Sequence, residues 1–238
     1  MSTVRIASAI TQVDGRIEAA LAAAGRPAGD VTLVVATKTV SAARTLEAVG
    51  AGARVLGESR VQDIVAKAAG LAALPQPPQV HMIGHLQSNK INALLRAGAV
   101  VSCVETIDSL ALADALGSRC VAAGRTMDVL VQVNVSGEAT KAGVAPRDAL
   151  DLAVAVAAVP GLRLRGLMTI GANTADVALV RAGYARLREL RDAVLASGAP
   201  GTQAATELSM GMSGDLEIAV AEGATIVRVG TAILGPRA

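Results

Sequence analysis

Short runs of β-branched and apolar residues alternate along the chain with longer segments of helical spacing. This alternation is typical of a parallel sheet covered by helices. The predicted strands are 31–37, 54–58, 80–84, 100–104, 129–135, 163–170, 205–208 and 225–230. Eight strands, each followed by a helical segment except the last, predict an α/β fold, a closed (β/α)8 TIM barrel, rather than an open sheet. An extra helix over residues 4–24 precedes the first strand.

A weak internal repeat supports this architecture, because three segments run in the order helix, glycine, alanine, strand. Gly52, Gly98 and Gly223 each stand where a predicted helix must stop. Glycine adopts the left-handed conformation without steric cost, so we expect each of them to end its helix and turn the chain into the next strand. The stretch richest in helix breakers, 74–79, is short enough for an ordinary loop, so a single domain over residues 1–238 is predicted.

Composition and charge narrow the range of partners. The chain carries 22 basic and 20 acidic residues and no run of like charge, so we do not expect a nucleic-acid partner. Phe and Trp are absent, and Tyr184, the only aromatic residue, is expected to be half-buried on a charged helix. The longest apolar stretch, 152–162, is interrupted by Pro160 and is too short to span a bilayer, so no membrane association is expected.

The N-terminal segment, the cysteines and the histidines favour a cytoplasmic protein that binds no metal. No export signal is expected in residues 1–20, which carry charges at helical intervals. Cys103 and Cys120 fit neither a metal knuckle nor a disulfide scaffold. His81 and His85 lie four residues apart, but they fall in a predicted strand without a third ligand, so we expect them to line the mouth of the barrel. A monomer is expected, since no long apolar helix face remains beyond barrel coverage.

Lys38 closes the first predicted strand and is one of only four lysines. The reacting groups of this fold lie at the carboxyl ends of its strands. Alternation puts Val34, Ala36 and Lys38 on one face. If that face points into the barrel, apolar neighbours desolvate the amine and lower its pKa, as an imine-forming lysine requires. A lysine that merely ends a strand and reaches solvent is the alternative, and the other three lysines lie in helical or polar contexts.

The exits of the last two predicted strands are rich in serine and glycine. Barrels of this kind frequently bind phosphate with these two loops and a helix N-terminus. The seventh exit carries Ser209, Gly211, Ser213 and Gly214, and the eighth carries Gly230 and Thr231. We expect Ser213 to cap a helix that begins near Gly214. The two loops together predict a ligand that carries phosphate.

Arg228 is the odd residue in the apolar eighth strand. It shares a face with Ile226 and Gly230, and an arginine directed into a barrel must find an acceptor. One interpretation is an internal ion pair with a residue such as Glu58 or Glu207. The other is a hydrogen bond to a ring nitrogen of a bound cofactor.

Seven blocks of the sequence together resemble the pyridoxal phosphate homeostasis proteins, a family similar to the barrel half of alanine racemase. The blocks are ATKTV, LGESRVQD, HMIGHLQSNK, VQVNVSGEATKAGV, RGLMTIG, ELSMGMSGDLEIAV and VRVGTAILG. The resemblance covers most of the chain and implies that Lys38 forms a Schiff base with pyridoxal 5′-phosphate (PLP). It further implies that Arg228 faces the pyridine nitrogen, and that the phosphate is surrounded by Ser209, Met210, Gly230 and Thr231.

Two places depart from the family pattern. Ser59 and Arg60 stand where Asn and Tyr are usual, so side-chain contacts from this strand end to the cofactor are not carried over. Gly171 stands where proline is common, which predicts a looser loop after the sixth strand.

The resemblance predicts a carrier of PLP rather than an enzyme. An arginine beside the ring nitrogen stays protonated and disfavours a pyridinium, which weakens the ring as an electron sink. A racemase also needs a second base, which the related racemases take from a second domain. We therefore predict reversible storage and intracellular delivery of PLP, with apo PLP-dependent enzymes as recipients. A racemase-like enzyme that uses His85 as a weak base and a Schiff-base aldolase acting on a sugar phosphate are the alternatives.

Overall fold

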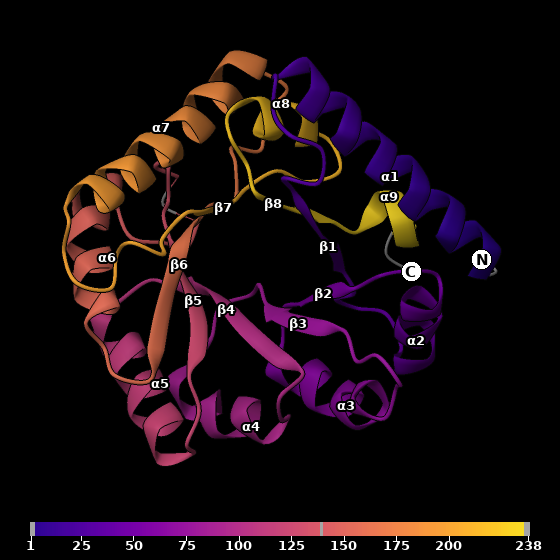
Figure 1. Cartoon of the computed structure of the whole chain (residues 1–238), viewed down its shortest axis with the longest axis horizontal. Helices are drawn as coiled ribbons and strands as arrows, with labels where there is room; N and C mark the ends of the chain where they lie inside the picture. Colours follow the sequence, from indigo (N-terminus) through magenta and orange to yellow (C-terminus); the bar gives the residue numbers. More distant parts are fainter. Residues whose placement is uncertain (1–2, 139, 236–238) are drawn as a thin grey trace.

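The computed structural model describes residues 3–138 and 140–235, and within them eight parallel strands close into a barrel in chain order (Figure 1). This confirms the predicted (β/α)8 architecture. The strands are β1 (Thr32–Ala36), β2 (Val55–Glu58), β3 (Gln79–Met82), β4 (Val101–Ile107), β5 (Met127–Gln132), β6 (Leu162–Met168), β7 (Glu207–Ser209) and β8 (Ile226–Val229). A single domain over 1–238 extends beyond the described residues and stays a prediction.

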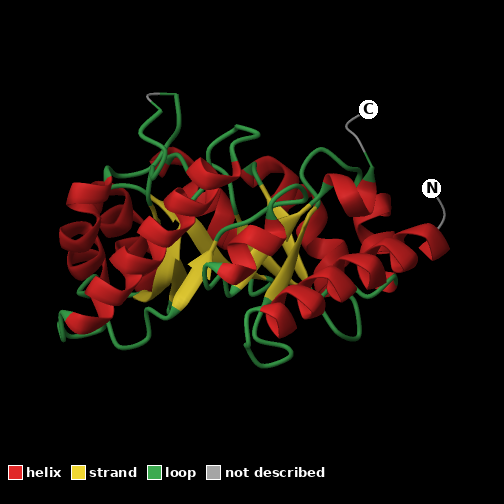
Figure 2. Cartoon of the chain, turned by 90° about the horizontal axis from the view of Figure 1, so that it is seen from above, coloured by secondary structure: helices red, strands yellow, loops and turns green. Residues whose placement is uncertain are grey.

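Helices surround the strands, so the barrel lies at the centre of the molecule in both views (Figure 2). They are α1 (Thr3–Ala23), α2 (Ala42–Gly50), α3 (Val61–Ala72), α4 (Ile91–Arg96), α5 (Leu110–Ala122), α6 (Ala149–Ala157), α7 (Val177–Ala196), α8 (Leu216–Ala221) and α9 (Thr231–Leu234), with short 3-10 turns η1 (Ser88–Lys90) and η2 (Pro146–Asp148). In the part of the chain that the structure describes, no helix has both the length and the apolar character needed to cross a membrane.

The extra N-terminal helix is present as predicted and covers one side of the barrel. Apolar residues recur along α1 every three or four positions, and this face is buried. The helix packs against α8, α9 and α2, which lie beside it in Figure 1. The N-terminal helix therefore closes the ring between the last and first helices of the barrel.

The glycine repeat has the conformation that the sequence predicts. Gly52, Gly98 and Gly223 have φ values of 114°, 83° and 97°. These angles lie in the left-handed region that disfavours a side chain. The three glycines therefore end their helices and turn the chain into β2, β4 and β8.

Tyr184 on α7 is fully buried, so the expectation of a half-buried position is wrong. It lies on the apolar face of α7 that packs on the barrel. The space for its ring comes from Gly171, where a Cβ atom would lie 2.7 Å from the Tyr184 hydroxyl oxygen. A proline at position 171 would meet the same obstacle.

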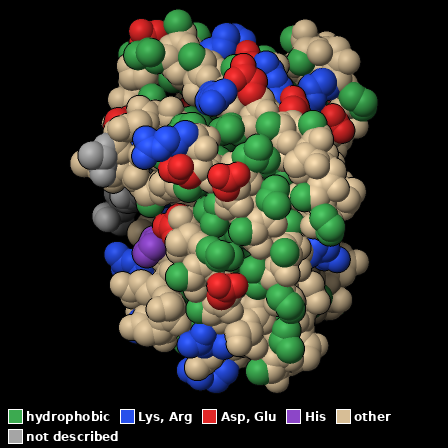
Figure 3. Space-filling view, turned by 90° about the vertical axis from the view of Figure 1, so that its left-hand side faces the viewer, with side chains coloured by type: hydrophobic (Ala, Val, Ile, Leu, Met, Phe, Trp, Pro, Cys, Tyr) green, Lys and Arg blue, Asp and Glu red, His purple; other side chains and the backbone are tan. Residues whose placement is uncertain are grey.

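The side of the molecule formed by α5, α6 and α7 is shown in Figure 3. Hydrophobic side chains gather along its middle with a few acidic side chains among them, and basic side chains lie mainly toward its ends. Exposed large apolar residues on these helices include Val121 on α5 and Val177 and Leu179 on α7. No block of a single charge covers this face.

Candidate functional site

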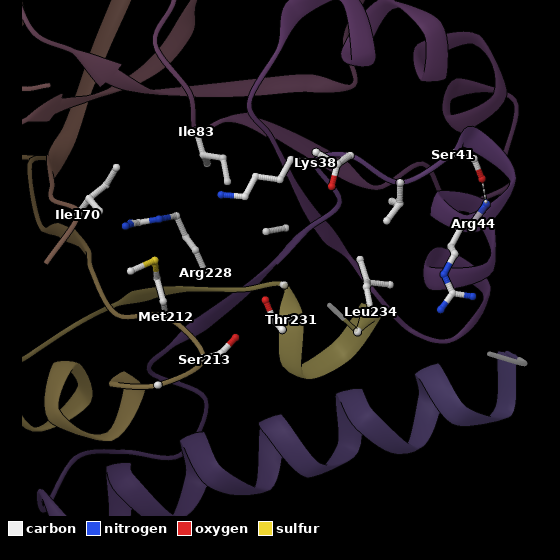
Figure 4. A pocket seen from close by; sticks show the side chains of 16 residues that line it. Lys38, Ser41, Arg44, Ile83, Ile170, Met212, Ser213, Arg228, Thr231 and Leu234 are labelled. Carbon is white, nitrogen blue, oxygen red and sulfur yellow. Dashed lines mark hydrogen bonds between the residues drawn. The ribbon is translucent and has the colours of Figure 1, made fainter. Parts of the chain in front are cut away.

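A cavity of 690 Å³ opens at the carboxyl ends of β1 and β8 (Figure 4). Its wall combines residues from the end of β1, from the loop after β7 and from the start of α9. Lys38, Arg44 and Arg228 line it, and no carboxylate is among its described lining residues. The cavity is therefore positively charged, which suits an anionic ligand.

Four of the six predicted site residues come together in this cavity. They are Lys38, Arg228, Gly230 and Thr231. Their segments lie far apart in the sequence, but β1 and β8 are neighbours in the closed barrel. The strand exits chosen from the sequence therefore meet at one place, although the binding roles of these residues stay a prediction.

Lys38 leaves the barrel at the end of β1 with the orientation that alternation predicts. Val34 lies in the apolar interior of the barrel, and Ala36 lines the cavity. In Figure 4 the amino group of Lys38 extends toward Arg228 and Ile83. The next residue, Thr39, has φ 71° and is the one non-glycine residue with a positive φ among those described. The chain thus turns sharply, in a conformation that β-branched residues rarely adopt, directly after the lysine.

A buried ion pair holds the strand end that carries Lys38. The ammonium of Lys67 on α3 lies 2.6 Å from Glu58 Oε1 and donates a hydrogen bond of 3.1 Å to the carbonyl of Thr37. The Thr37 hydroxyl donates to the same Glu58 oxygen at 2.6 Å. Lys67, which the sequence places in a helical context, is only 6% exposed. The sequence pattern shows a helical lysine but not the strand against which it packs.

Arg228 points into the barrel, as its place in the strand predicts, and it is 6% exposed. Its Nη2 donates to the carbonyl of Thr169 at 2.7 Å, and its Nη1 donates to Ser209 Oγ at 2.5 Å. Among the described residues, Arg228 forms an ion pair with Glu105, whose Oε2 lies 3.8 Å from Nη1. The guanidinium is therefore fixed from within the barrel while it also lines the cavity.

The expected ion pair of Arg228 with Glu58 or Glu207 is wrong. Glu58 pairs with Lys67, and Glu207 accepts a hydrogen bond from Thr225. The actual partner, Glu105, lies beyond the predicted end of the fourth strand at residue 104, because β4 continues to Ile107. An acidic residue interrupts the apolar run there, although the β-branched residues after it continue the strand.

Glu105 is completely buried and lies at the centre of a polar cluster inside the barrel. Its Oε2 accepts from Ser209 Oγ at 2.6 Å, and its Oε1 lies 2.6 Å from His81 Nδ1. Burial acts to raise the pKa of Glu105, but the hydrogen bond and charge of His81, with Arg228 and Ser209, outweigh burial and lower that pKa. The cluster therefore keeps Glu105 ionised beside Arg228.

The two histidines lie in different environments. His81 belongs to this buried cluster, so the expectation that it lines the mouth of the barrel is wrong. The side chain of His85 is 57% exposed and lies 3.4 Å from Asp108. His85 is also absent from the described lining of the cavity.

Two hydroxyls form the wall of the cavity opposite the lysine. Figure 4 shows Ser213 and Thr231 beside each other, with both hydroxyls directed into the same part of the cavity. Gly214 is next to Ser213 and also lines the cavity; a Cβ atom there would meet no atom within 4 Å. This part of the wall offers hydroxyl donors and open space for an anion.

The expected helix cap at Ser213 is wrong. Helix α8 begins at Leu216, with Asp215 at the N-cap position. The Asp215 side chain bonds elsewhere, because Oδ1 accepts from the Met212 N–H at 2.6 Å and Oδ2 accepts from the Tyr184 hydroxyl at 2.7 Å. These bonds fix the loop that presents Ser213 to the cavity.

Ser209 and Met210 do not line the cavity. Because β7 includes Ser209, the strand sends the Ser209 side chain into the barrel and the following Met210 side chain outward. The Ser209 hydroxyl bonds with Glu105 and Arg228, and Met210 is buried in the core around the barrel. The two side chains are therefore not part of the described cavity wall, and their contact with the phosphate stays a prediction.

Comparisons with known proteins agree with the resemblance drawn from the sequence blocks. The family model described as "Alanine racemase, N-terminal domain" matches residues 15–238. The pyridoxal phosphate homeostasis protein of Pseudomonas aeruginosa is 45% identical over 238 residues, which cover 100% of this chain and 97% of that protein. The chain belongs to the pyridoxal phosphate homeostasis protein family. Ser59 and Arg60, which depart from the usual family pattern, are not among the described residues lining the cavity.

Solved structures of similar proteins share the fold over nearly the whole chain. A protein from Bifidobacterium adolescentis is 45% identical with a TM-score of 0.91, and the match covers 98% of this chain and 95% of that one. PipY of Synechococcus elongatus, solved with PLP bound, is 35% identical with a TM-score of 0.79. That match covers 92% of this chain and 100% of PipY.

Proposed function

We propose that this member of the family binds PLP at Lys38 and takes part in holding and supplying this cofactor in the cell. One observation carries the proposal: a single positively charged cavity contains a lysine amine at one place and two hydroxyls at another. Bound PLP supplies an aldehyde that condenses reversibly with an amine. The names of the relatives and the PLP in the PipY structure support this choice of ligand.

The residues present fit PLP. Lys38 offers the amine, and Arg228 offers a guanidinium that is already fixed on its inner side. Ser213 and Thr231 offer hydroxyls for the phosphate, and Gly230 leaves β8 beside them without a side chain. The cavity has no described carboxylate that would repel the phosphate.

Arg228 favours storage over carbanion chemistry. Its guanidinium stays protonated, so it donates a hydrogen bond and disfavours a proton on a ring nitrogen that faces it. An unprotonated ring nitrogen makes a poor electron sink. In this proposal Arg228 binds and orients the ring, while Lys38 holds the ligand until another amine displaces it.

The cavity supports neither of the two enzyme alternatives. Apart from Lys38 and the arginines, no titratable side chain is among its described lining residues, so a second acid or base is not in evidence there. His85, the proposed weak base of a racemase, is exposed and lies outside this lining. We therefore propose a carrier and not an enzyme. Solvent deuterium at Cα of alanine would favour a racemase, and retro-aldol activity without added PLP would favour an aldolase.

The test of the proposal is a titration of the purified chain with PLP, followed by its visible absorption. We expect a visible band for wild type and for Lys90→Ala, a control in the turn η1 outside the described lining of the cavity. Lys38→Ala should give no such band. A wild-type protein that stays colourless would contradict the proposal, as would a band of full strength in Lys38→Ala.

Delivery, compartment and assembly are further parts of the proposal. We propose that an apo PLP-dependent enzyme recovers activity when it is mixed with the loaded protein. If transfer needs contact between the two proteins, this recovery should be faster than when a dialysis membrane separates them.

A cytoplasmic location is also proposed. Cys103 and Cys120 are buried free thiols, which fits the reducing cytoplasm. We propose a monomer, which light scattering should show as the mass of one chain.

A further inference from the structure

The interior of the barrel contains two groups of side chains of opposite character. One is an apolar cluster formed by Val34, Cys103, Leu130, Met168 and Ile226. The other, here called the interior polar cluster, consists of His81, Glu105, Ser209 and Arg228. On β4 and on β8 the polar residue follows the apolar one by two positions toward the carboxyl end. The polar cluster therefore lies on the side of the barrel that carries the cavity.

The interior polar cluster is a continuous chain of contacts from four strands. It runs from His81 on β3 to Glu105 on β4, then through the Ser209 hydroxyl on β7 to Arg228 on β8, with successive distances of 2.6, 2.6 and 2.5 Å. Arg228 is the one member among the described residues that line the cavity. The other three are buried inside the barrel and are not among the described lining residues.

Stability alone does not explain why these charges are inside the barrel. Replacing a buried ion pair by well-packed apolar residues is often neutral or stabilising. This chain fills the neighbouring part of the same interior with apolar side chains. Glu105 lies beside Arg228, the buried arginine of the cavity wall, and His81 bonds to Glu105, so their effect on Arg228 is the property to examine.

We propose that Glu105 and His81 are positioning residues for Arg228 and set the charge that faces the ring of the bound ligand. This inference rests on the proposed function. Ser209 and the Thr169 carbonyl fix two nitrogens of the guanidinium, and Glu105 balances its charge from inside the barrel. His81 holds the second oxygen of Glu105, so the carboxylate keeps its orientation toward Ser209.

The test compares Glu105→Gln with a matched variant at another buried carboxylate. Gln keeps the shape of Glu105 and removes its charge. Glu222 is also buried and bonds to Arg181 and Arg188, but it is not among the described lining residues of the cavity, so Glu222→Gln is the control. We expect Glu105→Gln to weaken PLP binding about tenfold, which is about 1.4 kcal/mol, and to move the maximum of the visible band. Glu222→Gln should lose stability while it keeps the wild-type affinity and band.

A second pair of variants applies if Glu105→Gln does not fold. Ser209→Ala removes the hydroxyl that links Glu105 to Arg228 and leaves both charges in place. Ser102→Ala on the same strand as Glu105 is the control, because its hydroxyl is buried without a hydrogen-bond partner. We expect a shifted band and weaker binding in Ser209→Ala only.

The outcomes separate this inference from the proposed function. A wild-type protein without any visible band contradicts the proposed function, and the inference falls with it. A wild-type band together with unchanged affinity and band position in Glu105→Gln overturns the inference alone. If that variant does not fold, the same result in Ser209→Ala overturns it. Equal changes in a variant and its matched control would assign the effect to general loss of packing and would also overturn it.

Discussion

The two walls of the cavity are held in place by different kinds of interaction. The amine wall, residues 37–39, rests on the buried Lys67–Glu58 ion pair, which reaches the Thr37 carbonyl. The hydroxyl wall, residues 212–214 and 231, rests on hydrogen bonds from Tyr184 and the Met212 N–H to Asp215. The carbonyl of Ser213 also accepts a hydrogen bond of 3.1 Å from Arg16, which is paired with Glu217 on the surface. One wall thus depends on two buried opposite charges, and the other on the Asp215 carboxylate and an exposed ion pair.

This difference matches what each wall has to hold. A lysine that reacts with an aldehyde must present one nitrogen at one place. A phosphate has several equivalent oxygens, so hydroxyls can bind it from more than one direction. We infer that the amine wall is fixed more strongly, and variants of the two walls should therefore fail in different ways.

The largest effect should follow from Lys67→Met on the amine wall. The change leaves Glu58 buried without its cation, and one oxygen of Glu58 has no hydrogen-bond partner already. Removing one member of a buried ion pair costs about 3–5 kcal/mol. Equilibrium urea denaturation should show a loss of that size in the free energy of unfolding.

The matched control for this change is Lys67→Met combined with Glu58→Leu. Because the whole pair is then apolar, most of the lost stability should return. PLP binding should stay weak in both variants, since neither holds the Thr37 carbonyl. A loss below about 1 kcal/mol in the single variant would show that the pair is not a strong support of this wall.

On the hydroxyl wall, Ser213→Ala combined with Thr231→Val should weaken PLP binding at least tenfold. A hydrogen bond to a charged group contributes about 1.5–3 kcal/mol. Pyridoxal, which lacks the phosphate, should bind this variant as it binds wild type, whereas Lys67→Met should weaken both ligands. Titrations with the two ligands measure the difference, and an equal loss for both would refute the assignment of this wall to phosphate.

Tyr184→Phe tests the support beneath the hydroxyl wall. Burial, with the negative charge of Asp215, raises the pKa of Tyr184, so the hydroxyl stays a donor across the working pH range. Its removal leaves Asp215 Oδ2 without this bond and should cost about 1–3 kcal/mol. We expect a lower free energy of unfolding and weaker PLP binding with little change for pyridoxal. A free energy of unfolding and a PLP affinity identical to wild type would show that Tyr184 does not support the hydroxyl wall.

The smallest effect should come from Thr39→Asn on the amine wall. Asn adopts a positive φ more readily than a β-branched residue does, so the strain at φ 71° should fall. The expected gain in the free energy of unfolding is no more than about 1 kcal/mol. A less stable Thr39→Asn protein would show that the Thr39 side chain makes a compensating contact.

The fold could be predicted because its signals are local. The helix-ending glycines and the apolar strand runs each depend on neighbouring residues, and all eight strands appear in the predicted order. The fourth strand shows the limit of that signal. Its apolar run breaks at Glu105, although the strand continues to Ile107, because the carboxylate is paired inside the barrel and need not face solvent.

The site could be predicted only in part, because some of its residues depend on elements that are distant in the sequence. Strand alternation places Lys38 and Arg228 on inward faces, and both line the cavity. Their supports, Lys67 and Glu105, become visible only when a helix or a second strand packs beside them. Spacing along the chain does not show which elements will be neighbours, so the ion pair with Glu58 or Glu207 was the wrong expectation for Arg228.

Reductive trapping shows which lysine binds PLP. The protein is mixed with PLP and treated with borohydride, which makes the bond between ligand and lysine permanent, and its peptides are then mapped by mass spectrometry. We predict the added mass on the peptide that contains Lys38. Added mass on Lys67, Lys90 or Lys141 in place of Lys38 would contradict it.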